Sequence, residues 1–287
     1  MRHSPVVILG CGYTGSRVAA RLLERGFEVI ATTRLAAALE SLRARGARIL
    51  ALDANIPGAA GQILRATPQG SLLLHSVPVF RRGCGWEDPT PQLLEPLAGV
   101  VRRVVYLSST SVYGDGHMVG EGTPVAPRSA RERLRVQAES HVRCGPWTSM
   151  ILRPAAIYGA WRGVHASMRA GKYVLIGEGA NYISRIHADD LAAHAVAALL
   201  SDLQGEWPVA DEHPCMAREV AEFCSRLLNI PMPPSVPRPP EEDTRRADRR
   251  VDGGAVRRAL GLTLRYPSYL TGIPAALEEE RAEPAIK

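Results

Sequence analysis

Short apolar runs alternate with amphipathic segments through the first two thirds of the chain. Residues 6–9 read Val-Val-Ile-Leu, and apolar residues recur at helical spacing in the segment 16–25 that follows. Near-continuous apolar strands separated by helices are typical of a parallel sheet covered on both faces. The pattern therefore predicts a doubly wound α/β fold, with strands at residues 6–9, 27–32, 48–52, 71–77, 103–108 and 149–152.

A glycine motif follows the first apolar run directly. It reads Gly10-x-Gly12-x-x-Gly15, and the predicted helix starts at the next residue. In such a motif the first glycine permits a tight turn, the second lets the backbone approach a pyrophosphate, and the third lets the helix pack closely on the strand. The helix N-terminus then offers unpaired N–H groups to the phosphates. A strand, this motif and a helix, in that order, predict dinucleotide binding by a Rossmann fold.

The pattern loosens in the last third of the chain, where glycines become frequent. A proline-rich stretch at 230–240 is typical of an extended connector. We expect an NAD(P)-binding Rossmann domain at residues 1–157, with the helix and strand near 189–211 packing back onto it, and a smaller C-terminal substrate lobe at 158–287 whose last residues fray. Helices are predicted at 16–25, 35–45, 127–143, 189–201, 216–228 and 252–260.

Composition and charge argue against several classes of protein. The formal net charge is +6, but the arginines are interleaved with acidic residues rather than gathered in a stripe, so we expect no nucleic-acid binding. No run approaches the roughly 18 apolar residues of a membrane span, and too few residues precede the first strand for a signal peptide. The 5 cysteines form no C-x-x-C pair, which favours free thiols in the cytoplasm over disulfides or a bound metal.

The end of the second predicted strand bears on the choice between NAD and NADP. An acid at this position binds the ribose 2′-hydroxyl, whereas a base accommodates a 2′-phosphate. The chain reads Ala-Thr-Thr33-Arg34 here, with no acid, so the sequence favours NADP over NAD. The alternative is that Arg34 is a surface residue at the start of the next helix. Asp53, after the third strand, has two interpretations. It could accept a hydrogen bond from the adenine amino group, or it could be an acidic loop residue without a role in binding.

Several ordered motifs over about residues 6–211 resemble the extended short-chain dehydrogenase/reductase family of the NAD-dependent epimerase/dehydratase type. After the glycine motif and Asp53 come Ser-Ser-Thr-Ser-Val-Tyr-Gly at 108–114, Arg-Pro-Ala-Ala-Ile-Tyr-Gly at 153–159 and Arg-Ile-His-Ala-Asp-Asp-Leu-Ala at 185–192. The resemblance implies a nucleotide across the C-terminal strand ends and a small-molecule substrate, and it leaves a homodimer open. The cofactor-binding residues it implies are Gly10, Gly12, Tyr13, Thr14, Gly15, Thr33, Arg34, Asp53, Val77 and Pro78.

The catalytic Tyr-x-x-x-Lys pair of that family is absent. Lys172 and Lys287 are the two lysines of the chain, and Met168 and Glu283 stand four residues before them. Arg131 falls on the position of the tyrosine, and Arg135 falls on the position of the lysine. A patch of Arg128, Arg131 and Arg135 would bind an acidic substrate, but charge patterning favours a solvated basic helix face.

Other side chains are candidates for the chemistry. Ser109 falls on the family's hydroxyl position, and Tyr113 could replace the missing proton donor. Tyr113 and Tyr158 each have a basic residue four positions later, His117 and Arg162 respectively. His187 is interpreted as a structural hydrogen-bonding residue.

Cys11 lies inside the phosphate loop. It is either a small packing residue or a reactive thiolate, and the first interpretation is favoured because thiol reactivity depends on a lowered pKa.

Two functions remain open. The first is an NAD(P)-dependent oxidoreductase or epimerase of an atypical short-chain dehydrogenase/reductase type, acting on a small or sugar-like carbonyl or hydroxyl compound through Ser109 and Tyr113. The second is a non-catalytic NADP(H)-binding sensor or scaffold. The retained substrate lobe favours the enzyme.

Overall fold

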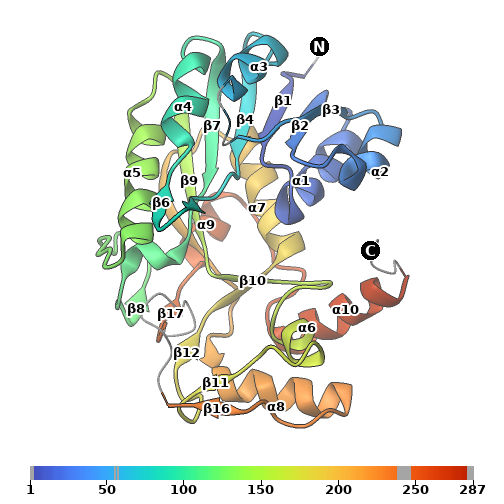
Figure 1. Ribbon diagram of the computed structural model, residues 1–287, viewed down its shortest axis with the longest axis vertical. Coiled ribbons are helices and arrows are strands. Elements are labelled where there is room, and N and C mark those ends of the chain that lie inside the picture. The colour runs from blue at the N-terminus through green and yellow to red at the C-terminus, as the bar shows by residue number, and fades with distance from the viewer. Residues whose placement is uncertain (1–2, 55, 57, 238–246, 283–287) are drawn as a thin grey trace. The chain divides into compact units, whose positions relative to one another are not determined.

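The computed structural model describes residues 3–54, 56, 58–237 and 247–282. Its central sheet has 7 strands in the order β14-β9-β7-β4-β1-β2-β3 (Figure 1). Neighbouring strands from β9 to β3 are paired in parallel. The predicted doubly wound α/β fold is confirmed. The strands are β1 (Val6–Leu9), β2 (Val29–Thr33), β3 (Arg48–Ala51), β4 (Ser71–His75), β7 (Val101–Leu107), β9 (Thr148–Pro154) and β14 (Gly205–Val209).

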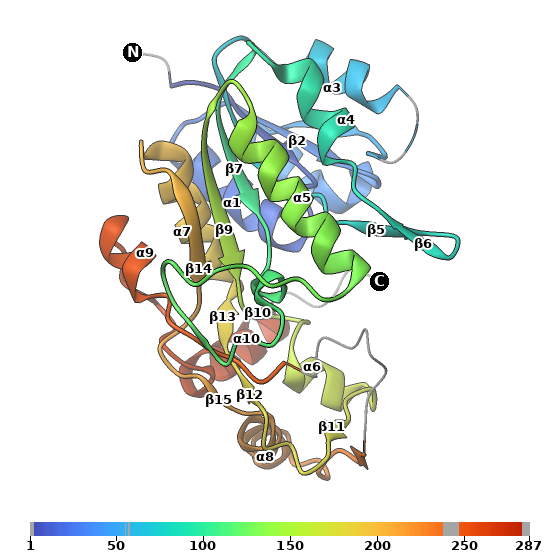
Figure 2. The ribbon, with the colours of Figure 1, turned by 90° about the vertical axis from the view of Figure 1, so that its left-hand side faces the viewer.

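Helices cover both faces of this sheet. Figure 2 shows α5 in front of the strands, beside α4 and α3, and the ribbons of α1 and α7 behind them. The helical elements that accompany the sheet are α1 (Tyr13–Glu24), η1 (Ala36–Leu39), α2 (Glu40–Ala44), α3 (Ala59–Ala66), α4 (Thr90–Leu94), η2 (Glu95–Leu97), η3 (Thr110–Tyr113), α5 (Ala130–Cys144) and α7 (Ala188–Leu200). A hairpin of β5 (Phe80–Arg82) and β6 (Gly85–Glu87) follows β4.

The alternation of side chains along the strands sets the core on each face. Val7, Leu73 and Tyr106 point to the face where they join Ile63 of α3 and Ala138 of α5 in one buried cluster. Successive strand residues point to opposite faces, so strands buried on both faces need the near-continuous apolar runs seen in the sequence.

The chain divides into two compact units. Unit 1 comprises Met1–Val112, Pro127–Arg153 and Ala192–Trp207, and unit 2 comprises Tyr113–Ala126, Pro154–Leu191 and Pro208–Lys287.

Unit 2 is built from helices and two-stranded ribbons. Tyr158 packs with residues of α6, α8 and α10 in its buried cluster. Its paired strands are β10 (Ala156–Tyr158) with β13 (Arg185–His187), β11 (Leu175–Ile176) with β16 (Ser235–Val236), β12 (Tyr182–Ile183) with β15 (Cys215–Met216), and β17 (Arg250–Val251) with β8 (Met118–Val119). Its further helices are α6 (Val164–Arg169), α8 (Ala217–Leu228), α9 (Gly254–Ala259) and α10 (Tyr269–Ala282).

Two segments of unit 2 differ from the sequence-based expectation. The predicted connector at 230–240 contains strand β16, which pairs in parallel with β11, and its residues 238–240 lie outside the described part. Helix α10 was not predicted, because Gly272 and Pro274 interrupt its pattern with the two residues least favourable to helix. The expected fraying concerned residues that include 283–287, which also lie outside the described part.

Helix α5 begins with a capping box. The Ser129 hydroxyl accepts a hydrogen bond from the Glu132 N–H at 3.2 Å, and the Glu132 carboxylate accepts one from the Ser129 N–H at 3.1 Å. This reciprocal pair satisfies two backbone donors at the helix start. It fixes where the helix starts, three residues after the predicted residue 127.

Candidate functional site

The three glycines of the β1–α1 loop occupy three different environments. Gly10 has a φ of +79°, and a Cβ placed on it would lie 2.9 Å from the Val77 backbone nitrogen. A Cβ on Gly12 would meet nothing within 4 Å, so this backbone is open to a ligand. A Cβ on Gly15 would lie 3.1 Å from the Gly10 carbonyl oxygen, where α1 passes close to β1. These environments match the turn, the ligand approach and the helix packing that the motif predicts.

Thr32 of β2 holds the start of this loop. Its hydroxyl accepts a hydrogen bond from the Gly10 N–H at 2.9 Å, and its carbonyl accepts one from the Cys11 N–H at 2.7 Å. The sequence-based prediction names the neighbouring Thr33 and not Thr32. The sequence does mark Thr32, because it is the first polar residue after an apolar run.

Cys11 is a packing residue of the loop. Its side chain is 2% exposed, and burial raises the pKa of its thiol to about 12. A buried thiol of this kind stays protonated near neutral pH and is a poor nucleophile. The structure thus supports the packing interpretation and contradicts the reactive thiolate.

The residues expected around the adenosine end lie at the ends of β2 and β3. Arg34 directly follows β2 and is exposed, and no polar partner of its side chain is found among the described residues. It does not start a helix, because η1 begins at Ala36. The Thr33 hydroxyl contacts the backbone of the same turn. Asp53 follows the end of β3 and is partly exposed.

The remaining cofactor candidates lie in the same unit. Tyr13 opens α1 with the Arg17 guanidinium 4.3 Å from its ring centroid, and Thr14 is buried. Val77 is partly buried against the core of the sheet, and Pro78 is exposed just after it. The structure therefore places these candidates at or after the carboxyl ends of β1 and β4.

The two serines after β7 have different roles. The Ser108 hydroxyl donates to the Glu139 carboxylate at 2.5 Å and is buried. The Ser109 hydroxyl oxygen accepts the Ser111 N–H at 3.1 Å and is partly exposed. In the described part of the chain no acceptor takes the Ser109 hydroxyl hydrogen, so this hydroxyl is available to donate to a ligand.

The solvated-face interpretation is wrong for Arg135. Its side chain is 6% exposed, and Nη1 donates to the Tyr106 hydroxyl at 3.4 Å. Arg131, one turn earlier, is partly buried with its guanidinium 5.2 Å from the centroid of the Trp86 ring. Arg128 and Arg133 lie on the exposed side of the segment. The helix therefore has a buried basic position that charge patterning could not reveal.

The tyrosines with a basic residue four positions later do not form helical pairs. Tyr113 is 2% exposed and ends η3, so His117 is not one turn along a helix from it. His117 instead lies 3.4 Å from the Asp248 carboxylate. Tyr113 belongs to unit 2, whereas Ser109 belongs to unit 1. Both stay predictions for catalysis.

Two further candidates of unit 2 are buried. Tyr158 is 2% exposed, and burial raises the pKa of its phenol above the usual value. His187 Nδ1 accepts the Asp189 N–H at 3.2 Å at the start of α7, in agreement with a structural role. In the described residues no three His, Cys, Asp or Glu side chains converge as metal ligands would.

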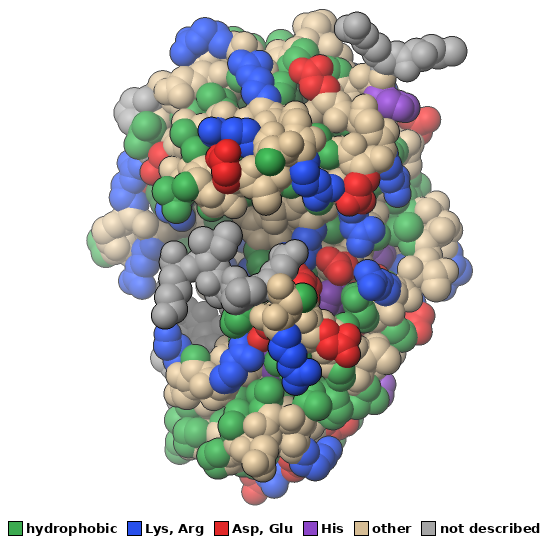
Figure 3. All heavy atoms as spheres, turned by 90° about the vertical axis from the view of Figure 1, so that its right-hand side faces the viewer, with side chains coloured by type: hydrophobic (Ala, Val, Ile, Leu, Met, Phe, Trp, Pro, Cys, Tyr) green, Lys and Arg blue, Asp and Glu red, His purple; other side chains and the backbone are tan. Residues whose placement is uncertain are grey.

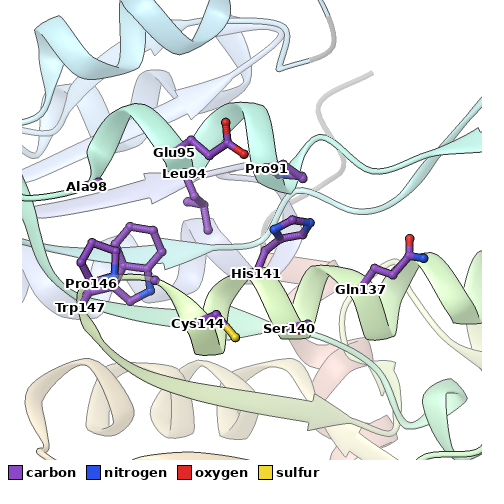
Figure 4. Close-up of a pocket in the computed structure, with 11 residues that line it drawn as sticks. Pro91, Leu94, Glu95, Ala98, Gln137, Ser140, His141, Cys144, Pro146 and Trp147 are labelled. Atoms are coloured by element: carbon purple, nitrogen blue, oxygen red, sulfur yellow. The ribbon is translucent and has the colours of Figure 1, made fainter.

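A hollow of about 430 Å³ in unit 1 lies away from these candidates. It is lined by residues of α4, η2, the last turns of α5 and the loop after α5, including Leu94, His141 and Trp147 (Figure 4). The end of α5 leads directly into the start of β9, so the hollow borders the amino edge of the sheet. Because a doubly wound sheet binds its ligand at the carboxyl edge, this hollow is separate from the candidate site.

The charge distribution on the surface and the lengths of the helices are relevant to binding of nucleic acids and membranes. On the face that Figure 3 shows, blue basic side chains are scattered among red acidic ones, without a continuous basic stripe. Among the described residues, each helix is too short or too polar to cross a bilayer.

Comparison with known proteins places this geometry in context. No family model matches the chain. The curated protein YeeZ of Escherichia coli K12 is 28% identical over 92% of this chain and 97% of its own. A solved structure of a conserved protein of unknown function from Silicibacter pomeroyi is 29% identical, covers 96% of this chain and 99% of its own, and has a TM-score of 0.78.

Solved structures of more distant proteins show the same fold. A protein from Methylobacillus flagellatus, described as an NAD-dependent epimerase/dehydratase, is 22% identical over 97% of this chain and 99% of its own, with a TM-score of 0.74. UDP-glucuronic acid 4-epimerase from Bacillus cereus, solved with UDP-glucuronic acid and NAD, is 17% identical over 98% of this chain and 99% of its own, with a TM-score of 0.78. The chain thus has the fold of the short-chain dehydrogenase/reductases of the NAD-dependent epimerase/dehydratase type.

Proposed function

We propose that the chain binds a nicotinamide dinucleotide, NADP in preference to NAD, and acts as an oxidoreductase or epimerase-like enzyme on a small or sugar-like carbonyl or hydroxyl compound. The observation that carries the proposal is the glycine loop. Gly12 alone of its three glycines has open space where a Cβ would stand, while Gly10 and Gly15 are held against backbone. A backbone exposed in this way, at the N-terminus of α1, fits a pyrophosphate.

The chain supplies groups for the pyrophosphate and for the adenosine half of the dinucleotide. Gly12 and the first N–H groups of α1 would hold the pyrophosphate, and Tyr13, Thr14, Val77 and Pro78 would border it. Arg34, exposed after β2, would bind the 2′-phosphate, with Thr33 beside it and Asp53 at the adenine. When bound, a nicotinamide dinucleotide supplies the donor or acceptor of a hydride.

Ser109 is the group of unit 1 best suited to a substrate oxygen. Its hydroxyl hydrogen is available, whereas Ser108 is committed to Glu139. An oriented donor of this kind stabilises charge that develops on a carbonyl oxygen. Tyr113, which belongs to unit 2, stays a sequence-based prediction for the proton donor, and solvent water is the other source of the proton.

A non-catalytic NADP(H)-binding sensor or scaffold is the second candidate. It is favoured by the burial of Tyr113, which is 2% exposed. A phenol enclosed in this way is poorly placed to exchange a proton with a substrate.

Titration calorimetry with NADP⁺ and NAD⁺ tests the binding. Gly12→Ala should weaken both by at least about tenfold, because its methyl group would occupy the space of the pyrophosphate. The melting temperature should stay near that of the wild type, since the new Cβ meets nothing within 4 Å. Gly61→Ala in α3 is the matched control, and equal affinities in the two variants would contradict the proposal.

Turnover separates the two functions. We expect the wild type to oxidise or reduce members of a panel of carbonyl compounds and nucleotide sugars, followed by NADPH absorbance, and Ser109→Ala to lower kcat. Nucleotide binding with no turnover across the panel, together with nucleotide-dependent association with a partner, would favour the sensor.

A further inference from the structure

Unit 1 buries three arginines, and two of them have several strong hydrogen-bond acceptors. Arg103, 2% exposed, donates to the carbonyls of Ala198 at 2.8 Å and Leu203 at 2.5 Å. Arg153, 7% exposed, donates twice to the Glu139 carboxylate. Carbonyls or a paired carboxylate are what a buried guanidinium needs, because burial of an uncompensated charge is costly.

Arg135 is the exception. It is 6% exposed, and the one hydrogen bond found for its five N–H groups in the described part of the chain goes to the Tyr106 hydroxyl at 3.4 Å. No carboxylate of the described residues lies within ion-pair distance of it. Glu139, one turn along α5, is already bound by Arg153 and Ser108.

The other polar neighbours of Arg135 form their hydrogen bonds with other groups, so none of them pairs with it directly. Asp88 accepts both the Thr90 N–H at 3.0 Å and the Thr90 hydroxyl at 2.6 Å. Because the Thr90 hydroxyl hydrogen goes to Asp88, Nε2 of His75, 2.9 Å from that hydroxyl oxygen, must carry the proton. His75 Nδ1 is then an acceptor, buried and without a partner among the described residues. The pKa of His75 is lowered to about 3 by burial and by the charge of Arg135, so this ring is neutral.

The position of Arg135 suits a ligand. Tyr106 is the last residue but one of β7, and His75, whose ring lies 4.9 Å from that of Tyr106, is the last residue of β4. Gly10, at the start of the phosphate loop, lies against the backbone just after β4. Adjacent strands are about 4.8 Å apart, so Tyr106, the hydrogen-bond partner of Arg135, is roughly two strand spacings from β1, near the edge where doubly wound sheets bind ligands.

We propose that the guanidinium of Arg135 is the binding site for an anionic group, a carboxylate or a phosphate, carried by the substrate. Its planar fork matches two oxygens of either group, and the ligand would supply a direct anionic partner, which Arg135 lacks among the described residues. Arg131, stacked on Trp86, is not part of this site. The substrate of the proposed enzyme is then an acidic or phosphorylated carbonyl or hydroxyl compound. The claim that the anion belongs to a substrate rests on the proposed function. Anion binding itself does not, since Arg135 and its neighbours all belong to unit 1.

The test uses inorganic phosphate and malonate as probes, titrated into the full chain in a buffer free of both. Malonate tests a carboxylate ligand and phosphate a phosphoryl ligand. We expect at least one probe to bind the wild type, and Arg135→Gln to weaken that probe by at least about tenfold. Arg133→Gln, an exposed arginine of the same helix, is the matched control and should bind like the wild type. Equal binding by Arg135→Gln and wild type overturns the proposal.

Stability without anions separates a binding arginine from a structural one. Removing a buried charge that has no direct ion-pair partner should leave the melting temperature of Arg135→Gln equal to or above that of the wild type. A lower melting temperature, or failure to fold, would make Arg135 structural and overturn the proposal.

NADP⁺ affinity is measured on the same samples. If the wild type binds no NADP⁺ but binds the anion through Arg135, the proposed function is wrong and the anion site stands. If the wild type binds NADP⁺ but Arg135→Gln binds the anion as well as the wild type does, the anion site is wrong and the proposed cofactor binding stands.

Discussion

Arg153, near the end of β9, binds Glu139 of α5 through two hydrogen bonds, from Nε to Oε1 at 3.0 Å and from Nη2 to Oε2 at 2.6 Å. The two side chains are 8% and 2% exposed. The Ser108 hydroxyl adds a third bond to the same carboxylate. The network ties α5 to the carboxyl ends of β7 and β9, and it fixes the backbone directly before the candidate Ser109.

Breaking this pair should destabilise the fold strongly. Glu139→Gln leaves the Arg153 guanidinium buried without a counter-charge, and we expect a loss of about 3–5 kcal/mol in the free energy of unfolding, measured by urea titration. Glu206→Gln removes the partly exposed partner of the exposed Arg143, a pair at 2.9 Å, and should cost less than about 1 kcal/mol. If the two variants lost similar amounts of free energy of unfolding, the buried Arg153–Glu139 pair would contribute no more to stability than the exposed pair, and the prediction would be wrong.

Arg34 should set the preference between the two dinucleotides. Its side chain is exposed directly after β2, where a base accommodates a 2′-phosphate. Arg34→Ala should raise the Kd for NADP⁺ by about tenfold and leave that for NAD⁺ within about twofold, as measured by calorimetry. Arg25→Ala, an exposed arginine after the end of α1, should change neither value. A parallel loss for both nucleotides would assign Arg34 to the fold instead.

The strands could be predicted because their signal is local. Burial on both faces requires an unbroken apolar run, so β1 and β4 are evident in the sequence. The environment of Arg135 is not local, because its burial depends on Tyr106, 29 residues earlier on another element. The same holds for Thr32, whose hydroxyl matters only because the chain returns beside Gly10. The glycine motif was evident, but the buried polar contacts that support it required the folded chain.

Cys11 should be unreactive in the folded protein, because burial raises the pKa of its thiol to about 12. Cys84 and Cys144 are exposed, whereas Cys11, Cys215 and Cys224 are buried. Titration with Ellman's reagent should therefore show 2 fast thiols in the native state and 5 in denaturant. The fast phase should be the same in Cys11→Ser. A third fast thiol that disappears in this variant would mean that the phosphate loop opens to solvent.

Asp211 of unit 2 should make stability depend on pH. It is 3% exposed, and burial raises the pKa of its carboxyl from 3.8 to about 7. The Asp190 charge adds to this rise, whereas the His213 N–H, Arg185 and Arg257 oppose it. The folded chain thus binds the proton more tightly than the unfolded chain. This contribution to stability is complete below about pH 4 and is lost as the pH rises through 7, on the order of 4 kcal/mol in all.

Asp211→Asn isolates this contribution, because an amide oxygen can still accept the His213 N–H, now bound by Oδ1 at 3.1 Å. The amide has no proton to lose, so the free energy of unfolding of the variant relative to the wild type should increase from pH 5 to pH 8. Urea titrations at intervals of one pH unit measure this difference. Asp202→Asn, which changes an exposed carboxylate, should show a flat difference over the same range. A flat difference for Asp211→Asn as well would mean that the Asp211 carboxylate is ionised in the folded chain and that Arg185 and Arg257 outweigh its burial.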